Sequence, residues 1–205
     1  MKNCLIVGGA TISNWPQIKQ YINHSDYTIA CDSGIVNCKK AGIIPDLIVG
    51  DFDSSEKPLT RIETIVLPRE KDDTDTVFAI KEAIKRGFDS IILIGAVGER
   101  LDHSLVNVYS LSLMEQSGVK GMIIDDYSIM ELVDGKATID ERFSYFSLIA
   151  IEGTLEDVTI KNAKFTLEKG VITPGYQYAT SNEVLTGKKA EISVGQGRAL
   201  LVKVF

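Results

Sequence analysis

The sequence lacks several features that would place it in a specialised class of proteins. It has three cysteines with no Cys-x-x-Cys pair, and its apolar runs are too short for a signal peptide core or a membrane span. An odd number of thiols predicts a reducing compartment, and without a targeting segment we expect a cytoplasmic protein. Cys4 and Cys31 lie in apolar runs and are expected to be small core residues.

A net positive charge is also missing. The chain has 22 Lys and Arg against 28 Asp and Glu, a formal net charge of −6. This balance opposes a phosphate backbone and an anionic membrane alike, so neither is expected as a partner. A nucleotide can still bind if a divalent cation, or a local set of basic side chains and backbone N–H groups, supplies positive charge.

Short apolar runs and segments of helical spacing alternate in the first part of the chain. The apolar runs are residues 4–7, 27–30, 47–49, 64–67, 91–94 and 122–124. Such an alternation is typical of a parallel sheet covered by helices. We therefore expect an α/β domain with a Rossmann-like parallel sheet over residues 1–126.

Two of the intervening segments have clear helical spacing. After Asp75, the first places Val77, Ile80 and Ile84 on one face. The second, after Asp102, places Val106, Tyr109 and Leu113 on one face. We expect both segments to be amphipathic crossover helices whose apolar faces pack on the sheet.

The pattern changes after about Asp126, where short β-type runs follow one another with turn signals between them. Asp134-Gly135 separates residues 128–133 from 136–139 and predicts a tight hairpin, because both central positions of such a turn favour positive φ. Further Gly-containing turns continue at the spacing of an antiparallel sandwich or barrel. We expect a second, all-β sandwich domain over residues 127–205.

Acidic side chains follow the third apolar run, in the segment Gly50-Asp51-Phe52-Asp53-Ser54. Ligands of open parallel sheets bind beyond the carboxyl ends of the strands. Two carboxylates spaced two residues apart in an extended segment project to the same side. Such a pair suits Mg²⁺, which prefers oxygen ligands and is commonly shared with substrate phosphates, although turns also favour Asp for local hydrogen bonds.

A second acidic group, Asp72-Asp73-Thr74-Asp75, opens the next predicted helix and follows Lys71. Helix capping accounts for one or two of these residues. It does not account for Lys71 beside three carboxylates, whereas a site that binds phosphate and metal needs both signs of charge. We expect Asp75 to join Asp51 and Asp53 at the metal and Lys71 to contact a phosphate.

The glycine pairs are less specific. Neither a Walker A motif nor Gly-x-Gly-x-x-Gly is present. Gly8-Gly9 and Ser33-Gly34 are compatible with ordinary strand-to-helix turns. They are also compatible with backbone N–H groups that approach a phosphate or ribose. Likewise, Asp102 is compatible with a structural helix cap.

Taken in order, several segments resemble the thiamine pyrophosphokinase family. They are Cys31-Asp32-Ser33-Gly34, Gly50-Asp51-Phe52-Asp53-Ser54, Lys71-Asp72-x-Thr74-Asp75-Thr76, Gly95-x-x-Gly98-x-Arg100-x-Asp102-His103 with Asn107, and Thr180-Ser181-Asn182. The resemblance runs across nearly the whole chain. It implies a homodimeric enzyme that transfers pyrophosphate from ATP to the hydroxyl of thiamine, giving thiamine diphosphate and AMP.

The resemblance also implies roles for individual residues. Asp51, Asp53 and Asp75 would hold Mg²⁺; Asp32, Gly34 and Asn37 would lie at the nucleotide; Lys71, Thr74 and Arg100 would face ATP; and Asp102, Ser181 and Asn182 would contact thiamine. The last two would complete the site across a dimer interface. A carboxylate near thiamine is chemically sensible because the thiazolium is a permanent cation and the aminopyrimidine offers N–H donors.

The sequence departs from the family pattern at two places. Some members carry a C-terminal tryptophan that stacks on thiamine, whereas the single tryptophan here is Trp15; Tyr178 is a candidate substitute, and packing within the β domain is the other interpretation. Cys31 and Ser33 also stand where Ala and Gly are more usual.

Two other functions remain compatible with parts of the sequence. The segment 47–55 resembles the strand and Asp-x-Asp of haloacid-dehalogenase phosphatases, with Asp51 as a covalent nucleophile and Asp125-Asp126 as the later acidic pair. Against that interpretation, two strand-helix units precede this strand. A non-catalytic protein that binds nucleotide or thiamine is the second alternative.

Overall fold

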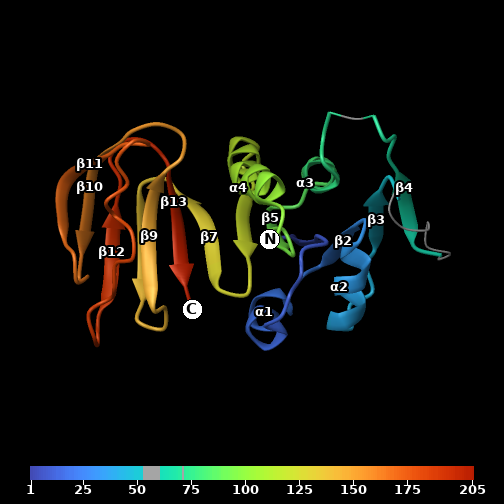
Figure 1. Cartoon of the computed structure of the whole chain (residues 1–205), viewed down its shortest axis with the longest axis horizontal. Helices are drawn as coiled ribbons and strands as arrows, with labels where there is room; N and C mark the ends of the chain where they lie inside the picture. The colour runs from blue at the N-terminus through green and yellow to red at the C-terminus, as the bar shows by residue number, and fades with distance from the viewer. Residues whose placement is uncertain (53–60, 71) are drawn as a thin grey trace. The chain divides into compact units, whose positions relative to one another are not determined.

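The chain forms two compact units, residues Met1–Asp126 and Tyr127–Phe205, in a computed structural model that describes residues 1–52, 61–70 and 72–205 (Figure 1). The first unit contains a parallel sheet with helices, and the second contains antiparallel strands. The fold is therefore of the mixed α/β type, with its parallel and antiparallel parts in separate units.

The described residues of unit 1 form six parallel strands. They are β1 (Asn3–Val7), β2 (Tyr27–Cys31), β3 (Leu47–Gly50), β4 (Glu63–Val66), β5 (Ser90–Ile94) and β6 (Lys120–Ile124). Their order across the sheet is β4-β3-β2-β1-β5-β6. Each coincides with one of the predicted apolar runs to within about two residues at either end, so the alternation in the sequence is confirmed.

In the described parts of the connections there are four helices: α1 (Trp15–Ile22), α2 (Gly34–Ala41), α3 (Asp75–Lys85) and α4 (Leu101–Gln116). Parallel crossovers are right-handed, so the first two connections, which run from β1 toward β3, place their helices on one face of the sheet. The connections from β4 to β5 and from β5 to β6 run the opposite way. Figure 1 accordingly shows α1 and α2 on one side of the strands and α3 and α4 on the other. The direction of winding reverses between β1 and β5.

The core of unit 1 lies on both faces of this sheet. Leu5, Ile6, Ile29 and Leu93 are almost fully buried, as expected for strands covered by helices on both sides. On α3 the deeply buried residues include Ile80 together with small alanines, while the flanking Val77 and Ile84 are half-buried. The predicted apolar face of this helix is thus centred correctly.

The predicted apolar face of α4 is wrong. Val106 and Tyr109 are 43% and 51% exposed, and Leu101 and Leu105 on the same side are 70% and 50% exposed. The side that faces the sheet carries Ser104, Asn107, Ser110, Leu111 and Met114. The small polar side chains on that side form hydrogen bonds to nearby backbone carbonyls, so α4 buries a largely polar face that apolar periodicity does not detect.

Unit 2 consists of seven antiparallel strands. They are β7 (Ser128–Val133), β8 (Lys136–Asp140), β9 (Tyr145–Ala150), β10 (Leu155–Lys161), β11 (Leu167–Ile172), β12 (Lys189–Ser193) and β13 (Ala199–Val204). One group has the order β7-β13-β9 and the other β11-β10-β12-β8. Its buried residues include Phe146, Leu148, Val158, Ile172 and Leu201.

The expected hairpin at Asp134-Gly135 does not form. The flanking strands are where the sequence predicts them, but β7 pairs with β13 and β8 pairs with β12. Gly135 has φ 85°, and its carbonyl accepts a hydrogen bond from Val194 N–H at 2.7 Å. The turn therefore passes the chain from one group of strands to the other, alongside a matching passage between β12 and β13. A local turn signal indicates a change of direction but not the partner of each strand.

The three cysteines are buried free thiols, as the sequence predicts for Cys4 and Cys31. Burial raises the pKa of the Cys4 thiol to about 12, which makes it unreactive near neutral pH. Within residues 1–52, 61–70 and 72–205, no helix has both the length and the apolar character needed to span a bilayer.

Candidate active site

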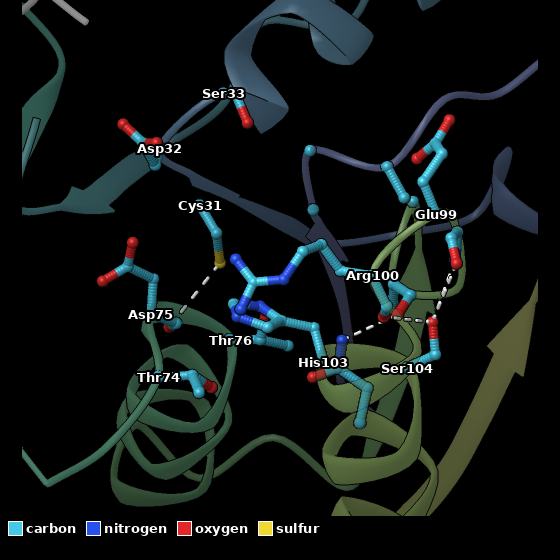
Figure 2. A pocket seen from close by; sticks show the side chains of 17 residues that line it. Cys31, Asp32, Ser33, Thr74, Asp75, Thr76, Glu99, Arg100, His103 and Ser104 are labelled. Atoms are coloured by element: carbon cyan, nitrogen blue, oxygen red, sulfur yellow. Dashed lines mark hydrogen bonds between the residues drawn. The ribbon is translucent and has the colours of Figure 1, made fainter. Parts of the chain in front are cut away.

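A cavity of about 310 Å³ opens at the carboxyl ends of the parallel strands, where the direction of winding reverses (Figure 2). It is lined by the segments that follow β1, β2 and β5 and by the first turns of α3 and α4. This position is the usual ligand site of open α/β sheets because the loops there diverge to opposite faces. The cavity is therefore the candidate site in unit 1.

The glycine loops after β1 and β5 are joined to each other. Gly8 N–H donates to the Ile94 carbonyl at 2.8 Å, and Ala10 N–H donates to the Gly95 carbonyl at 2.9 Å. A Cβ on Gly8 would overlap the carbonyl oxygen of Gly95, and Gly95 itself has φ 60°. These glycines are required for the close approach of the two loops, which brings both to the edge of one cavity.

Asn37, which the resemblance places at the nucleotide, lies behind the first loop. Its side chain is 3% exposed, and its amide nitrogen donates to the carbonyls of Gly8 and Ala10 at 2.8 and 2.9 Å. Gly34 is also buried, where a Cβ would overlap the Val7 carbonyl. Neither residue is among those that line the cavity. Both fix the shape of the loop that does.

Asp32 lies directly at the cavity, at the end of β2. It has φ 41°, an unusual value for a residue other than glycine, and its N–H donates to the Val49 carbonyl at 2.7 Å. Gly50 allows β3 to approach it, since a Cβ there would lie 3.2 Å from Asp32 Cα. Asp51, half-buried, follows β3 at the same edge, and Asp53 falls outside the described residues.

The first turn of α3 brings Thr74 and Asp75 to the cavity (Figure 2). The Thr74 hydroxyl caps the helix by accepting from Val77 N–H at 3.2 Å. The Cys31 thiol donates to the Asp75 backbone carbonyl at 3.7 Å, and burial raises its pKa strongly. Asp73, by contrast, forms an ion pair with Lys81 outside the cavity lining. Lys71 lies outside the described residues.

Arg100 and Asp102 are paired with each other. The Arg100 guanidinium donates from Nε and Nη2 to the two Asp102 carboxylate oxygens at 3.0 and 2.6 Å, and both side chains are largely exposed. This bidentate contact lowers the pKa of the Asp102 carboxyl far below its usual range. Figure 2 shows the Arg100 side chain extending across the cavity from the α4 side, whereas Asp102 is not part of the lining.

Other polar residues line the cavity without having been given a role in advance. The Ser104 hydroxyl accepts from Gly98 N–H at 3.1 Å and donates to the Arg100 carbonyl at 2.9 Å, which holds the loop after β5. Glu99, His103 and Asn107 also line the cavity. His103 and Asn107 belong to the motif that resembles the family, which assigned them no contact, whereas Glu99 was marked only by its position after an apolar run.

The acidic side chains have the hard oxygen chemistry that Mg²⁺ prefers. Asp32 and Asp75 line the cavity, and Asp51 follows the strand next to Asp32. In the described part of the chain, however, no three His, Cys, Asp or Glu side chains are grouped closely enough to hold a metal ion. Of the predicted set Asp51, Asp53 and Asp75, Asp53 lies outside the described residues, so the set as a whole stays a prediction.

Ser181 and Asn182 lie in unit 2, in a turn beside β9. Ser181 is exposed, has φ 54°, and its N–H donates to the Ser147 hydroxyl at 3.0 Å. Asn182 is 2% exposed. Its side chain donates to the Phe165 carbonyl at 2.7 Å and accepts from the N–H groups of Phe165 and Glu183 at 3.0 and 2.9 Å. The side chain of Asn182 thus holds the turn, and that of Ser181 is accessible.

Tyr178, the candidate substitute for a stacking tryptophan, is 41% exposed. Its hydroxyl donates to the Val171 carbonyl at 2.9 Å, and its ring lies 5.2 Å from that of Tyr176. An aromatic surface is present on unit 2, and its contact with thiamine remains a prediction.

Comparisons with known proteins agree with one another. Residues 18–123 match the family model "Thiamin pyrophosphokinase, catalytic domain", and residues 136–198 match "Thiamin pyrophosphokinase, vitamin B1 binding domain". Thiamine pyrophosphokinase of Bacillus subtilis is 30% identical, with 99% of each chain covered. The crystal structure of the thiamine pyrophosphokinase from Bacillus subtilis superposes with a TM-score of 0.86 at 25% identity, and 99% of each chain is covered. That from Geobacillus thermodenitrificans superposes with a TM-score of 0.81 at 26% identity, over 99% of this chain and 97% of the other. The chain belongs to the thiamin pyrophosphokinase family.

Proposed function

We propose that this enzyme transfers pyrophosphate from ATP to the hydroxyl of thiamine, giving thiamine diphosphate and AMP. The observation that carries the proposal is the cavity at the carboxyl ends of β1 and β5. Its lining residues from Cys31 to Asn107 lie within the stretch that matches the family's catalytic domain. The thiamine hydroxyl attacks the β-phosphorus in line, and AMP leaves. Such a transfer depends on positioning and on charge neutralisation more than on covalent catalysis.

In this proposal a divalent metal, Mg²⁺, is held by Asp51, Asp53 and Asp75. Two of these carboxylates are provided at the end of β3 and the start of α3, and Asp32 adds a third acidic side chain at the same edge. When bound, the metal would neutralise the charge of the ATP phosphates. The carboxylates contribute by fixing its position and by leaving room for phosphate oxygens.

Unit 1, a Rossmann-like sheet in this proposal, binds ATP. Asp32 and Thr74 line the cavity, and Arg100 reaches across it with a permanent positive charge that suits phosphate oxygens. Lys71 is proposed to add a second positive charge. Gly34 and Asn37 act indirectly, through the loop that they support.

Unit 2, a β-sandwich in this proposal, contributes to thiamine binding through Ser181 and Asn182, with Asp102 of unit 1 as the carboxylate near the thiazolium. The exposed Ser181 hydroxyl is suited to direct contact, and Asn182 holds the turn that presents it. The match of this unit to the family's vitamin B1 binding domain supports the assignment.

A homodimer with the site at the subunit interface is part of the same proposal. It is supported by the exposed apolar side of α4, where Leu101, Leu105, Val106 and Tyr109 are each at least 43% exposed. Such a patch is typical of a surface that another protein covers. Replacing both Leu105 and Tyr109 by Glu should give a monomer in sedimentation, and a variant that sediments like the wild-type dimer would contradict this assignment.

One assay tests the reaction itself. The protein is incubated with ATP, Mg²⁺ and thiamine, and the products are resolved by chromatography. We expect AMP and thiamine diphosphate in equal amounts. Phosphate release from monoesters would instead support a phosphatase, and binding without turnover would support a non-catalytic protein. The structure argues against the phosphatase, because the carboxylate of Asp126 is engaged with the N–H groups of Ser13 and Asn14 at 2.8 Å.

A further inference from the structure

Asn107 stands out among the buried polar residues of unit 1. It lies on the side of α4 that faces the sheet, its side chain is 6% exposed, and it lines the cavity. Its amide nitrogen donates to the Ala96 carbonyl at 2.7 Å. A carbonyl oxygen requires a donor, so the amide must present its NH₂ group to Ala96 and its Oδ1 to the other side.

Oδ1 of Asn107 has no hydrogen-bond donor from the protein within residues 1–52, 61–70 and 72–205. Two serine hydroxyls on the same side of α4 are engaged elsewhere: that of Ser104 with the loop after β5, and that of Ser110 with the backbone carbonyl of Asn107 itself at 2.6 Å. The side chain is thus held in one orientation by Ala96 while its acceptor is left at the cavity surface.

An acceptor in this position favours a ligand that places a hydrogen-bond donor against it. A ligand that covers Oδ1 without offering a donor would leave a buried carbonyl oxygen unpaired, which costs about 1–3 kcal/mol. Phosphate oxygens cannot serve, because at neutral pH they are predominantly acceptors. The groups that fit are an N–H or O–H of a base, a sugar or a pyrimidine.

We propose that Asn107 is a specificity-determining residue whose Oδ1 accepts a hydrogen bond from an amino or hydroxyl group of a bound substrate. This inference rests on the proposed function, which supplies two sources of such a donor: the adenosine part of ATP, through its 6-amino and ribose hydroxyl groups, and thiamine, through its pyrimidine amino group. Asn107 therefore distinguishes substrates by a donor that lies away from the reacting phosphates.

The test pairs a protein variant with ligand analogues and measures equilibrium dissociation constants by calorimetry. Asn107→Leu keeps the branched shape of the side chain and removes the acceptor, together with the amide nitrogen that donates to the Ala96 carbonyl. The ligands are ATP, 2′-deoxy-ATP, 3′-deoxy-ATP, purine riboside triphosphate without the 6-amino group, thiamine, and oxythiamine, in which a carbonyl oxygen, an acceptor, replaces the pyrimidine amino group. One parent ligand should bind Asn107→Leu about 3–10-fold more weakly than wild type, as expected for one neutral hydrogen bond.

The analogue that lacks the contacted donor should bind both proteins alike, because the variant and the analogue remove the same contact. Which analogue behaves so identifies the source of the donor. A merely structural role would weaken all ligands and analogues together, and that result would overturn the proposal. Ser112→Ala is the matched control on the same helix, since its hydroxyl is buried without a partner and its removal should leave every constant unchanged.

Two further measurements distinguish failure of the Asn107 proposal from failure of the variant to fold and from failure of the proposed function. If Asn107→Leu does not fold, the NMR resonance of the Asn107 side-chain amide in the wild-type protein is measured instead. A chemical-shift change with the parent ligand that is absent with the analogue supports the proposal. Equal changes with both ligands overturn it. AMP formation is measured in parallel. Ligand binding without AMP formation refutes the proposed function alone, whereas turnover without any difference between parent and analogue refutes the role of Asn107 alone. Absence of all binding refutes both.

Discussion

Two buried asparagines, one in each unit, make opposite use of their side chains. Asn182 in unit 2 is 2% exposed, and both its nitrogen and its oxygen are engaged by the backbone of a neighbouring turn. Asn107 in unit 1 is 6% exposed, and only its nitrogen is engaged by the protein. The first had been predicted as a substrate contact, and the second had been given no role. The difference teaches that two similarly buried asparagines can differ in the hydrogen-bonding capacity they leave for a ligand, so burial alone does not identify a direct contact.

The largest effect is expected for Asp75→Asn, which should lower the rate of the reaction far more than the stability of the fold. Asp75→Asn removes one anionic side chain at almost constant volume, so the rate of AMP formation should fall roughly 10²–10³-fold, the usual loss for a preorganised electrostatic group. Because Asp75 begins α3, the free energy of unfolding should fall by only about 0.3–1 kcal/mol. The measurements are initial rates across a Mg²⁺ titration and urea unfolding.

Asp73→Asn is the control for this variant, since Asp73 lies two residues away and is paired with Lys81 outside the cavity lining. It should leave the rate within a factor of two, a margin of about 0.4 kcal/mol in the activation free energy. An Asp75→Asn protein with wild-type rates and wild-type magnesium dependence would remove Asp75 from the proposed metal site.

A second pair of changes sharpens the contrast between loop support in the two units. Asn37→Leu leaves the carbonyls of Gly8 and Ala10 without their donor. Asn182→Leu leaves the Phe165 carbonyl without its donor and the Glu183 N–H without its acceptor. Each should lower the free energy of unfolding by about 2–4 kcal/mol, because two or more buried polar groups lose a partner. Urea unfolding measures the loss.

Kinetics then separates the two variants. The KM for ATP should rise in Asn37→Leu and the KM for thiamine in Asn182→Leu, each with less effect on the other substrate. Asn162→Gly is a milder control, since its amide contact to the Lys189 carbonyl is solvent-facing and glycine suits its φ of 57°. Equal effects of both leucine variants on both substrates would mean that the two supports do not serve separate parts of the site.

The smallest expected effect concerns Asp102. Asp102→Asn should raise the KM for thiamine roughly tenfold, as expected for loss of a charged contact, with little change in the KM for ATP. Arg100 lowers the pKa of this carboxyl in the folded protein, so any stability from the pair is present above the unfolded pKa and is lost only as pH falls through the lowered one. The KM for thiamine should therefore stay flat between pH 8 and roughly pH 5, above the unperturbed aspartate pKa of about 3.9. A rise within that interval would point to another group.

Much of the fold follows from local sequence. Each strand of unit 1 is an uninterrupted apolar run because it is buried on both faces, and such runs are visible without knowledge of their neighbours. The turn at Asp134-Gly135 shows the limit, since its glycine indicates where the chain bends but the partner of each flanking strand is about 60 residues away. Pairing at that distance depends on the whole unit.

The candidate site was accessible to sequence reasoning to the extent that it lies at strand ends. Asp32, Asp75 and Arg100 do line the cavity. The indirect role of Asn37 could not be foreseen, because it depends on the close approach of two glycine loops from distant strands. The polar inner side of α4 was missed for a related reason: a serine or asparagine that bonds a nearby carbonyl is as buried as a leucine but carries no apolar signal.

The pairing of β12 and β13 with β8 and β7 has a consequence for the order of synthesis. β13 lies between β7 and β9, so the first strands of unit 2 have no complete set of neighbours until residues 189–204 have left the ribosome. Unit 1 contains all six of its strands within residues 3–124 and meets no such delay. During translation the strands and helices around the cavity of unit 1 are thus synthesised first, while the edges of β7 and β9 stay open to other chains until the last strand arrives.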